Sequence, residues 1–98
     1  MSDKAFYVYL MASKPYGTIY TGMTSDMPGR DWQHKNKIHE GFTKKYGVTM
    51  LVYYEQHPSF ESAVLREKKI KAWQRQWKIN LINEHNPNWE DLSVHLRL

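Results

Sequence analysis

The chain has 98 residues and contains no cysteine. This absence excludes disulfide bonds, thiolate metal sites and cysteine nucleophiles, and it is typical of the reducing cytosol. No apolar run approaches the roughly 20 residues that a membrane-spanning helix needs. The first residues do not have the basic and then apolar pattern of a secretory signal. We therefore expect a cytoplasmic protein with no membrane partner.

The composition is that of a folded globular domain, with 41% hydrophobic and 24% charged residues. The length fits one domain over residues 1–98. The net charge of +4 favours an anionic partner such as nucleic acid. Most telling is the segment 66–78, which carries six Lys or Arg residues, one Glu and two interleaved tryptophans.

Three aromatic and β-branched runs, at residues 6–12, 18–23 and 48–55, predict three strands. The first two form a hairpin, because a turn with Pro15 and Gly17 separates them. Capping residues and helical periodicity predict helices from residue 26 to about Ile38, from Ser59 to about Gln74, and over about 75–84. Residues 41–46 form a short helix or a loop. The prediction is an α/β fold of order ββαβαα, a three-stranded antiparallel sheet flanked by helices.

Two tyrosines face each other across the predicted hairpin. A two-residue loop at Lys14-Pro15 would place Tyr9 directly opposite Tyr20, and a shift of one residue would separate them. Gly22 lies on the same face as Tyr20, and a glycine inside a strand often marks the close approach of a ligand or of another backbone. The alternative is that the aromatic pair only stabilises the sheet.

Arg30 and His34 are four residues apart and therefore share a face of the first predicted helix. Taken by itself, such a pair is more typical of a solvated helix surface. His39 is not on that face, and the five histidines show no spacing typical of zinc ligands.

A single carboxylate interrupts the apolar face of the long predicted helix. At about 100° per residue, the apolar side chains there fall on one arc about 180° wide. This arc contains Phe60, Ala63, Val64, Ile70, Trp73 and Trp77, with Glu67 among them. A carboxylate on a buried face is costly unless a partner satisfies it. A divalent cation, an arginine, or Lys71 one turn further along could be that partner.

Taken in order, these residues resemble a known family. Tyr7-Val8-Tyr9 followed by Tyr20-Thr21-Gly22 resembles the paired motif of the GIY-YIG endonuclease superfamily, with Tyr7 where the family has glycine. The similarity continues through residues 24–26, Arg30, His34, residues 66–73 and residues 86–92, and covers about 6–92. The chain is most similar to small single-domain bacterial members, which are related to the N-terminal nuclease domain of the excinuclease that makes the incisions in excision repair.

The resemblance implies a metal-dependent DNA endonuclease that hydrolyses phosphodiester bonds in DNA repair or processing. Glu67 would hold one divalent cation, Mg²⁺ or Mn²⁺, and Arg30 would bind the scissile phosphate. Tyr20 would deprotonate the attacking water, Tyr9 would orient it, and His34 would relay a proton. No small-molecule cofactor is expected.

The DNA would be contacted by Arg30, Lys68, Lys71 and Arg75, mainly through its backbone. Two departures from close relatives weaken this expectation: Gly29 replaces a second arginine, and Asp31 places a negative charge beside the presumed phosphate site. Two other functions stay open. One is a nucleic-acid-binding module of the same fold without turnover. The other is an interaction protein in which Glu67 only pairs with Lys71.

Three tryptophans of the helical segments are able to stack on bases where they are exposed: Trp32, Trp73 and Trp77. Trp73 and Trp77 lie on the apolar arc, so we expect both in the core.

Overall fold

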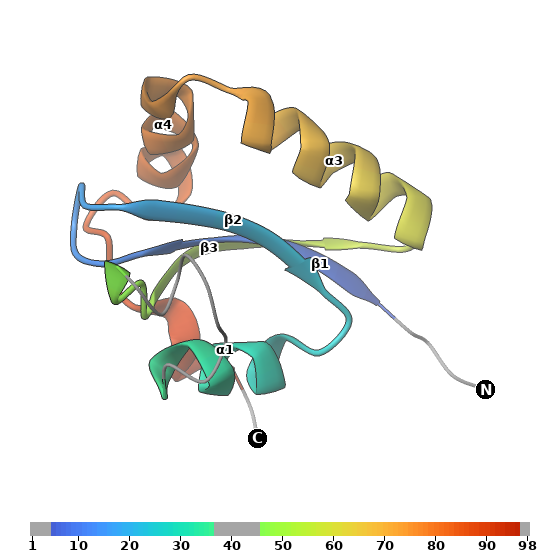
Figure 1. Cartoon of the computed structure of the whole chain (residues 1–98), viewed down its shortest axis with the longest axis horizontal. Helices are drawn as coiled ribbons and strands as arrows, with labels where there is room; N and C mark the ends of the chain where they lie inside the picture. The colour runs from blue at the N-terminus through green and yellow to red at the C-terminus, as the bar shows by residue number, and fades with distance from the viewer. Residues whose placement is uncertain (1–4, 37–45, 97–98) are drawn as a thin grey trace.

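The structure, a computed structural model, describes residues 5–36 and 46–96 (Figure 1). Its elements in chain order are β1 (Phe6–Ala12), β2 (Ile19–Thr24), α1 (Met27–Lys35), β3 (Met50–His57), α3 (Phe60–Ala72), α4 (Arg75–His85) and the 3₁₀ helix η1 (Leu92–His95). The predicted order ββαβαα is confirmed. The predicted helix end at Ile38 and the segment 41–45 lie outside the described residues. Within the described ranges, no helix is long and apolar enough to cross a membrane.

The sheet has the order β2-β1-β3, and both strand pairs are antiparallel, as predicted. Helices α3 and α4 cover one face, while α1 and η1 lie on the other (Figure 1). Alternate residues of the central strand β1 therefore enter two cores. Val8 and Leu10 pack in the cluster that includes α3 and α4, whereas Tyr9 and Met11 pack with Met27 of α1.

The hairpin register differs from the one that a two-residue loop would give. Ala12 pairs with Ile19, so the connection spans residues 13–18. It is closed by hydrogen bonds from Ser13 N–H to the Thr18 carbonyl (3.0 Å) and from Gly17 N–H to the Lys14 carbonyl (2.8 Å). The longer loop shifts the pairing of the two strands, and the predicted opposition of the two tyrosines is wrong.

In the observed register, Tyr9 lies opposite Gly22, and Tyr20 lies opposite Met11. The two tyrosines still share a face as diagonal neighbours, with ring centroids 6.2 Å apart. A Cβ atom at Gly22 would lie 2.6 Å from the Tyr9 hydroxyl oxygen and 2.7 Å from Cζ. The close approach at Gly22 is thus made by the ring of Tyr9, which lies across the edge strand.

The two C-terminal helices are separate. Ser59 caps α3 as predicted, its hydroxyl accepting a hydrogen bond from Ser62 N–H (3.1 Å). Trp73 and Gln74 then have extended backbones, and α4 begins at Arg75. This break shifts the phase of the helix, and Trp77 is 52% exposed. The prediction that Trp77 lies in the core is therefore wrong, whereas Trp73 is partly buried against the α3–α4 core.

The segment after α4 is tied to β3 by a buried asparagine. The Asn86 side-chain amide donates to the carbonyl oxygens of Val52 (3.0 Å) and Glu90 (2.9 Å), and its oxygen accepts from Glu90 N–H (3.1 Å). Trp89 then fills the core, with the ring of Tyr16 stacked on it at 4.5 Å. The hairpin turn thus packs, through Tyr16, against Trp89 in the segment after α4.

Substituting alanine at Gly22 tests the contact with Tyr9. We expect Gly22→Ala to lower the free energy of unfolding by about 1–3 kcal/mol, because the Tyr9 ring must leave its position. Urea denaturation measures this loss. In a Tyr9→Leu background the same change should cost much less, since leucine lacks the atoms that a new Cβ would meet. An equal cost in both backgrounds would show that the Tyr9 ring is not the obstacle.

Candidate active site

Four of the five predicted catalytic residues come from four different elements, and three of them interact with the fourth, Tyr9. Tyr9 belongs to β1, Tyr20 to β2, Arg30 to α1 and Glu67 to α3. The rings of Tyr9 and Tyr20 are neighbours. Arg30 hydrogen-bonds to Tyr9, and the charge of Glu67 acts on the same phenol. The fifth residue, His34, follows Arg30 by one turn of α1, and its side chain lies outside the described part of the structure.

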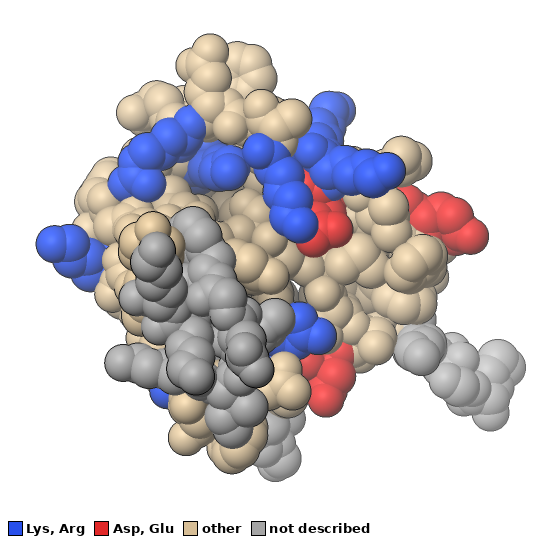
Figure 2. All heavy atoms as spheres, viewed as in Figure 1, with Lys and Arg blue, Asp and Glu red and all other residues tan. Residues whose placement is uncertain are grey.

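The site lies at the edge of the sheet formed by β2. Arg30 belongs to α1, which lies on one face of the sheet, and Glu67 belongs to α3, which covers the other face and contacts β2 (Figure 1). Because Gly22 has no side chain, Tyr9 of the central strand extends over β2 and joins the two helices. Figure 2 shows Lys and Arg side chains gathered over α3 and α4 on this side of the molecule.

Tyr9 keeps its proton at neutral pH. Burial raises the pKa of the Tyr9 phenol well above its ordinary value of 10, and the nearby Tyr20 and Glu67 raise it further. The charge of Arg30 and its hydrogen bond to Tyr9 act in the opposite direction without restoring the pKa. Tyr9 is therefore suited to hold and orient its neighbours rather than to accept a proton.

Glu67 forms an ion pair with Lys71, with 2.9 Å between Oε2 and Nζ. The Glu67 side chain is 19% exposed and that of Lys71 is 52% exposed, so the lysine lies on the solvent side of the pair. Because the Lys71 ammonium lies in solvent, it can leave the pair and be hydrated by water. The alternative of a Lys71 partner is thus realised, and the carboxylate stays accessible from solvent.

Glu67 also suits one kind of metal ion. Among the described residues, no group of three His, Asp or Glu side chains is arranged to hold a cation by itself. Mg²⁺ commonly binds through one or two carboxylates, several waters and the phosphate of a substrate. A single, partly exposed carboxylate fits a cation that is completed by the substrate in this way.

Two residues of α1, Gly29 and Asp31, are expected to weaken DNA binding, and both make contacts within the fold. Gly29 lies in the first turn of α1, where its N–H donates to the Asp26 carboxylate (3.2 Å). A Cβ at Gly29 would collide with that carboxylate. The glycine thus makes room for the helix cap.

The Asp31 carboxylate lies beside Lys35, and the expectation that its charge weakens the phosphate site stays a prediction. The residue is 8% exposed, and its Oδ1 makes no hydrogen bond, with Lys35 Nζ at 3.4 Å. Lys35 in turn binds Asp91 at 2.7 Å, next to η1. Burial raises the pKa of Asp31, and the charge of Asp91 adds to this, while Lys35 opposes it.

The basic segment 66–78 is divided between two sides of α3. Arg66 Nε donates to Glu55 Oε2 of β3 (2.9 Å) and its guanidinium lies over Trp73. Although burial opposes it, hydrogen bonds from Tyr53, His57 and Arg66 lower the pKa of Glu55 and keep it charged. Arg66 is therefore a structural cation. The alternation of polar residues along β3 is the only sequence signal for this cluster.

On the other side, Lys71 and Arg75 lie close to a third cation, Lys78, which is not among the DNA contacts predicted from the sequence. Burial lowers the pKa of Lys78, and the charges of Arg75 and Lys71 lower it further. Arg75 also donates to the Tyr16 carbonyl in the hairpin turn (2.6 Å). Lys68 is exposed. Lys71, Arg75 and Lys78 lie close together, and Lys71 pairs with Glu67. These three cations create a positive potential that attracts a polyanion.

Comparisons with known proteins agree with the motifs. A family model described as the GIY-YIG catalytic domain matches residues 5–80. The UPF0213 protein of Staphylococcus saprophyticus is 36% identical over 78 residues, which cover 80% of this chain and 94% of that protein. The UPF0213 protein of Streptococcus sanguinis is 33% identical over 88 residues, covering 90% and 99%. The solution NMR structure of the UPF0213 protein from Bacillus halodurans matches with a TM-score of 0.57 and 30% identity, covering 89% of this chain and 92% of that one.

The buried Asp31 gives a prediction about pH. The pKa of Asp31 is raised in the folded chain, so folding favours its protonated form. The stability that this gives is fully present below the pKa of Asp31 in the unfolded chain, and it is lost as the pH rises through the pKa in the folded chain. We therefore expect Asp31→Asn to raise the free energy of unfolding at pH 7, by up to about 1 kcal/mol, with the gain shrinking below about pH 4. Urea denaturation at the two pH values measures this.

Asp91→Asn is the matched control, and its expected change in the free energy of unfolding has the opposite sign. Hydrogen bonds from Lys35 and Ser93 outweigh burial and lower the pKa of Asp91, so its stabilisation is present at neutral pH and is lost on acidification. Asp91→Asn should therefore destabilise the chain at pH 7. A loss of stability at pH 7 in Asp31→Asn as well would contradict the assignment for Asp31.

Proposed function

Because the chain belongs to the GIY-YIG catalytic domain family, we propose that it is a metal-dependent endonuclease that hydrolyses phosphodiester bonds of DNA in repair or processing. The family is one of nucleases. The observation that carries the proposal is the meeting of two phenols, a guanidinium and a carboxylate at the β2 edge of the sheet. These groups supply a phosphate ligand, a base and a metal ligand within one small site.

Arg30 binds the scissile phosphate. A guanidinium is planar and always charged, and it donates two parallel hydrogen bonds to phosphate oxygens. The hydrogen bond to Tyr9 fixes its direction before the substrate arrives. Such a pre-oriented donor stabilises the negative charge that grows on the phosphate in the transition state.

Tyr20 accepts the proton of the attacking water. The water oxygen forms a bond to phosphorus as the bond to the leaving oxygen breaks, and the water proton moves to the phenolate oxygen of Tyr20, which has first released its own proton to solvent. Tyr9 keeps its proton and orients the water. His34 gives a proton to the leaving oxygen.

Glu67 holds the cation. When bound there, Mg²⁺ or Mn²⁺ neutralises the phosphate and stabilises the leaving oxygen. Lys71 keeps the carboxylate in place until that moment and then turns to the DNA backbone. No small-molecule cofactor takes part.

A second function is favoured by one observation. The Glu67–Lys71 ion pair occupies the carboxylate, and a chain that kept this pair with DNA bound would be a nucleic-acid-binding module without turnover. The two functions differ in their need for a metal and in their response to removal of the Glu67 charge.

The charge of Glu67 is tested by Glu67→Gln. We expect this isosteric change to reduce metal-dependent nicking of supercoiled plasmid and branched DNA by more than about a hundredfold, because the ligand charge is lost. The assay compares Mg²⁺, Mn²⁺ and EDTA. Glu61→Gln, at an exposed position on the same helix, should cut like the wild type. If Glu67→Gln cuts normally, Glu67 does not hold the metal. DNA binding by the wild type with no cleavage in any metal would favour the binding module.

The base is tested by Tyr20→Phe. We expect the single-turnover cleavage rate to fall by about a hundredfold, the usual scale for a lost general base. Tyr54→Phe, a half-buried tyrosine on the same face of the sheet, is the control and should keep the wild-type rate. An unchanged rate in Tyr20→Phe would show that Tyr20 is not the base.

A further inference from the structure

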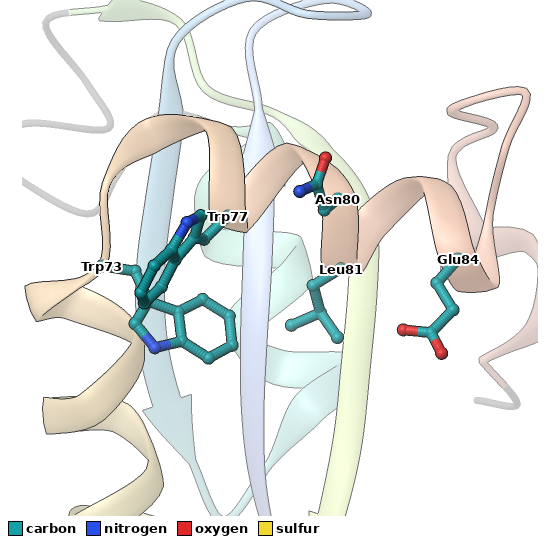
Figure 3. Close-up of a pocket in the computed structure, with 5 residues that line it drawn as sticks. All are labelled: Trp73, Trp77, Asn80, Leu81 and Glu84. Carbon is teal, nitrogen blue, oxygen red and sulfur yellow. The ribbon is translucent and has the colours of Figure 1, made fainter.

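A pocket outside the candidate active site opens where α3 meets α4. Its volume is about 330 Å³, and it is lined by Trp73, Trp77, Asn80, Leu81 and Glu84 (Figure 3). The two indoles lie together at one end, Glu84 lies at the other, and Leu81 lies between them. Pockets of this size accept small flat ligands.

The aromatic end of the pocket is pre-formed. Trp73 packs against the α3–α4 core and lies 5.4 Å below the guanidinium of Arg66, which Glu55 holds. Trp77 meets Trp73 edge to face, with centroids 6.1 Å apart and an angle of 72°. Trp77 is nevertheless 52% exposed. An aromatic face that is fixed in direction but open to solvent is a surface on which a base can stack.

A band of lysines connects the candidate active site with this pocket. Around α3, three lysines lie at about 40° (Lys71), 100° (Lys68) and 200° (Lys69) from Glu67, and Trp73 lies at about 240°, with other side chains such as the exposed Leu65 between them. All three lysines are exposed. Among the described residues, neither Lys68 nor Lys69 has an ion-pair partner. From Glu67 to Trp73 the helix rises only about 9 Å. The cations over α3 and α4 are visible in Figure 2.

We propose that the Trp73–Trp77 pocket binds an unpaired nucleotide of the DNA, so that the protein selects DNA in which a single strand adjoins a duplex. This inference rests on the proposed function and names the substrate class for it. The side chains favour this occupant: the lysine band suits a phosphate backbone, and the exposed indole of Trp77 suits a base. Glu84 repels a phosphate from the pocket and can accept a hydrogen bond from a base amino group. In an intact duplex the base faces are covered by their neighbours, and only the lysines can act.

The test measures DNA binding without cleavage. Fluorescence anisotropy in EDTA compares three probes: a labelled single strand, a duplex, and a duplex with a single-stranded overhang. Trp77→Ala should weaken binding to the single strand and to the overhang DNA by about tenfold or more, the scale of one lost stacking contact, and leave the duplex within about twofold. Trp77→Phe, which keeps a ring, should lie between Trp77→Ala and the wild type.

Trp32→Ala is the matched control, because Trp32 is 55% exposed and lies on α1, on the other face of the sheet. It should leave binding of all three probes unchanged. Lys68→Ala should weaken all three probes and reduce the salt dependence by about one unit of slope. If Trp77→Ala weakens no probe, or weakens the duplex equally, the pocket does not bind an unpaired nucleotide.

The two proposals fail separately. Because the binding assay contains no metal, its outcome does not depend on turnover. Cleavage with no effect of Trp77→Ala on binding overturns the pocket assignment alone. A selective effect of Trp77→Ala in a protein that never cleaves overturns the nuclease alone and leaves a binding module for DNA with unpaired strands.

Discussion

The placement of the Tyr9 ring across Gly22 is the contact on which the candidate site depends. Tyr9 starts from the central strand, and only the missing Cβ at Gly22 lets its phenol reach the edge of the sheet. There it forms a hydrogen bond with Arg30 from one helical layer and interacts electrostatically with Glu67 from the other. Because the ring is buried, it cannot follow small movements of these helices. One close contact between two strands thus fixes the relative position of residues from four elements.

Helix α3 carries the second constraint, because its sides serve different purposes. One side brings Glu67 and Lys71 to the edge of β2. On the other side, Arg66 donates a hydrogen bond to Glu55 of β3, and this contact fixes the helix on the sheet. The same guanidinium packs over the Trp73 ring. The basic segment is therefore not a uniform positive surface. Arg66 is engaged inside the fold, while the outward lysines remain to attract an anion.

The sequence alone predicts the order of elements, the antiparallel sheet, the cap at Ser59 and the family, because each depends on local patterns or on an ordered motif. The hairpin register escapes prediction, since the six-residue connection is held by Tyr16 and Trp89 packing at a distance. The burial of Asp31 depends on η1 and Lys35. Trp77 leaves the core because the helix breaks at Trp73–Gln74, which no residue there signals. The roles of Tyr9, Tyr20, Arg30, His34 and Glu67 stay predictions.

Helix α1 brings one cation, Arg30, to the candidate site, while its first turn carries the Asp26 carboxylate, which accepts a hydrogen bond from Gly29 N–H. The remaining attraction must come from α3 and α4, through Lys68, Lys71 and the cluster around Lys78. These two helices also hold the aromatic pocket. In this chain, therefore, the helix that carries Glu67, the proposed metal ligand, also carries part of the proposed DNA-selecting surface, and displacing α3 would disturb the proposed binding and cleavage together.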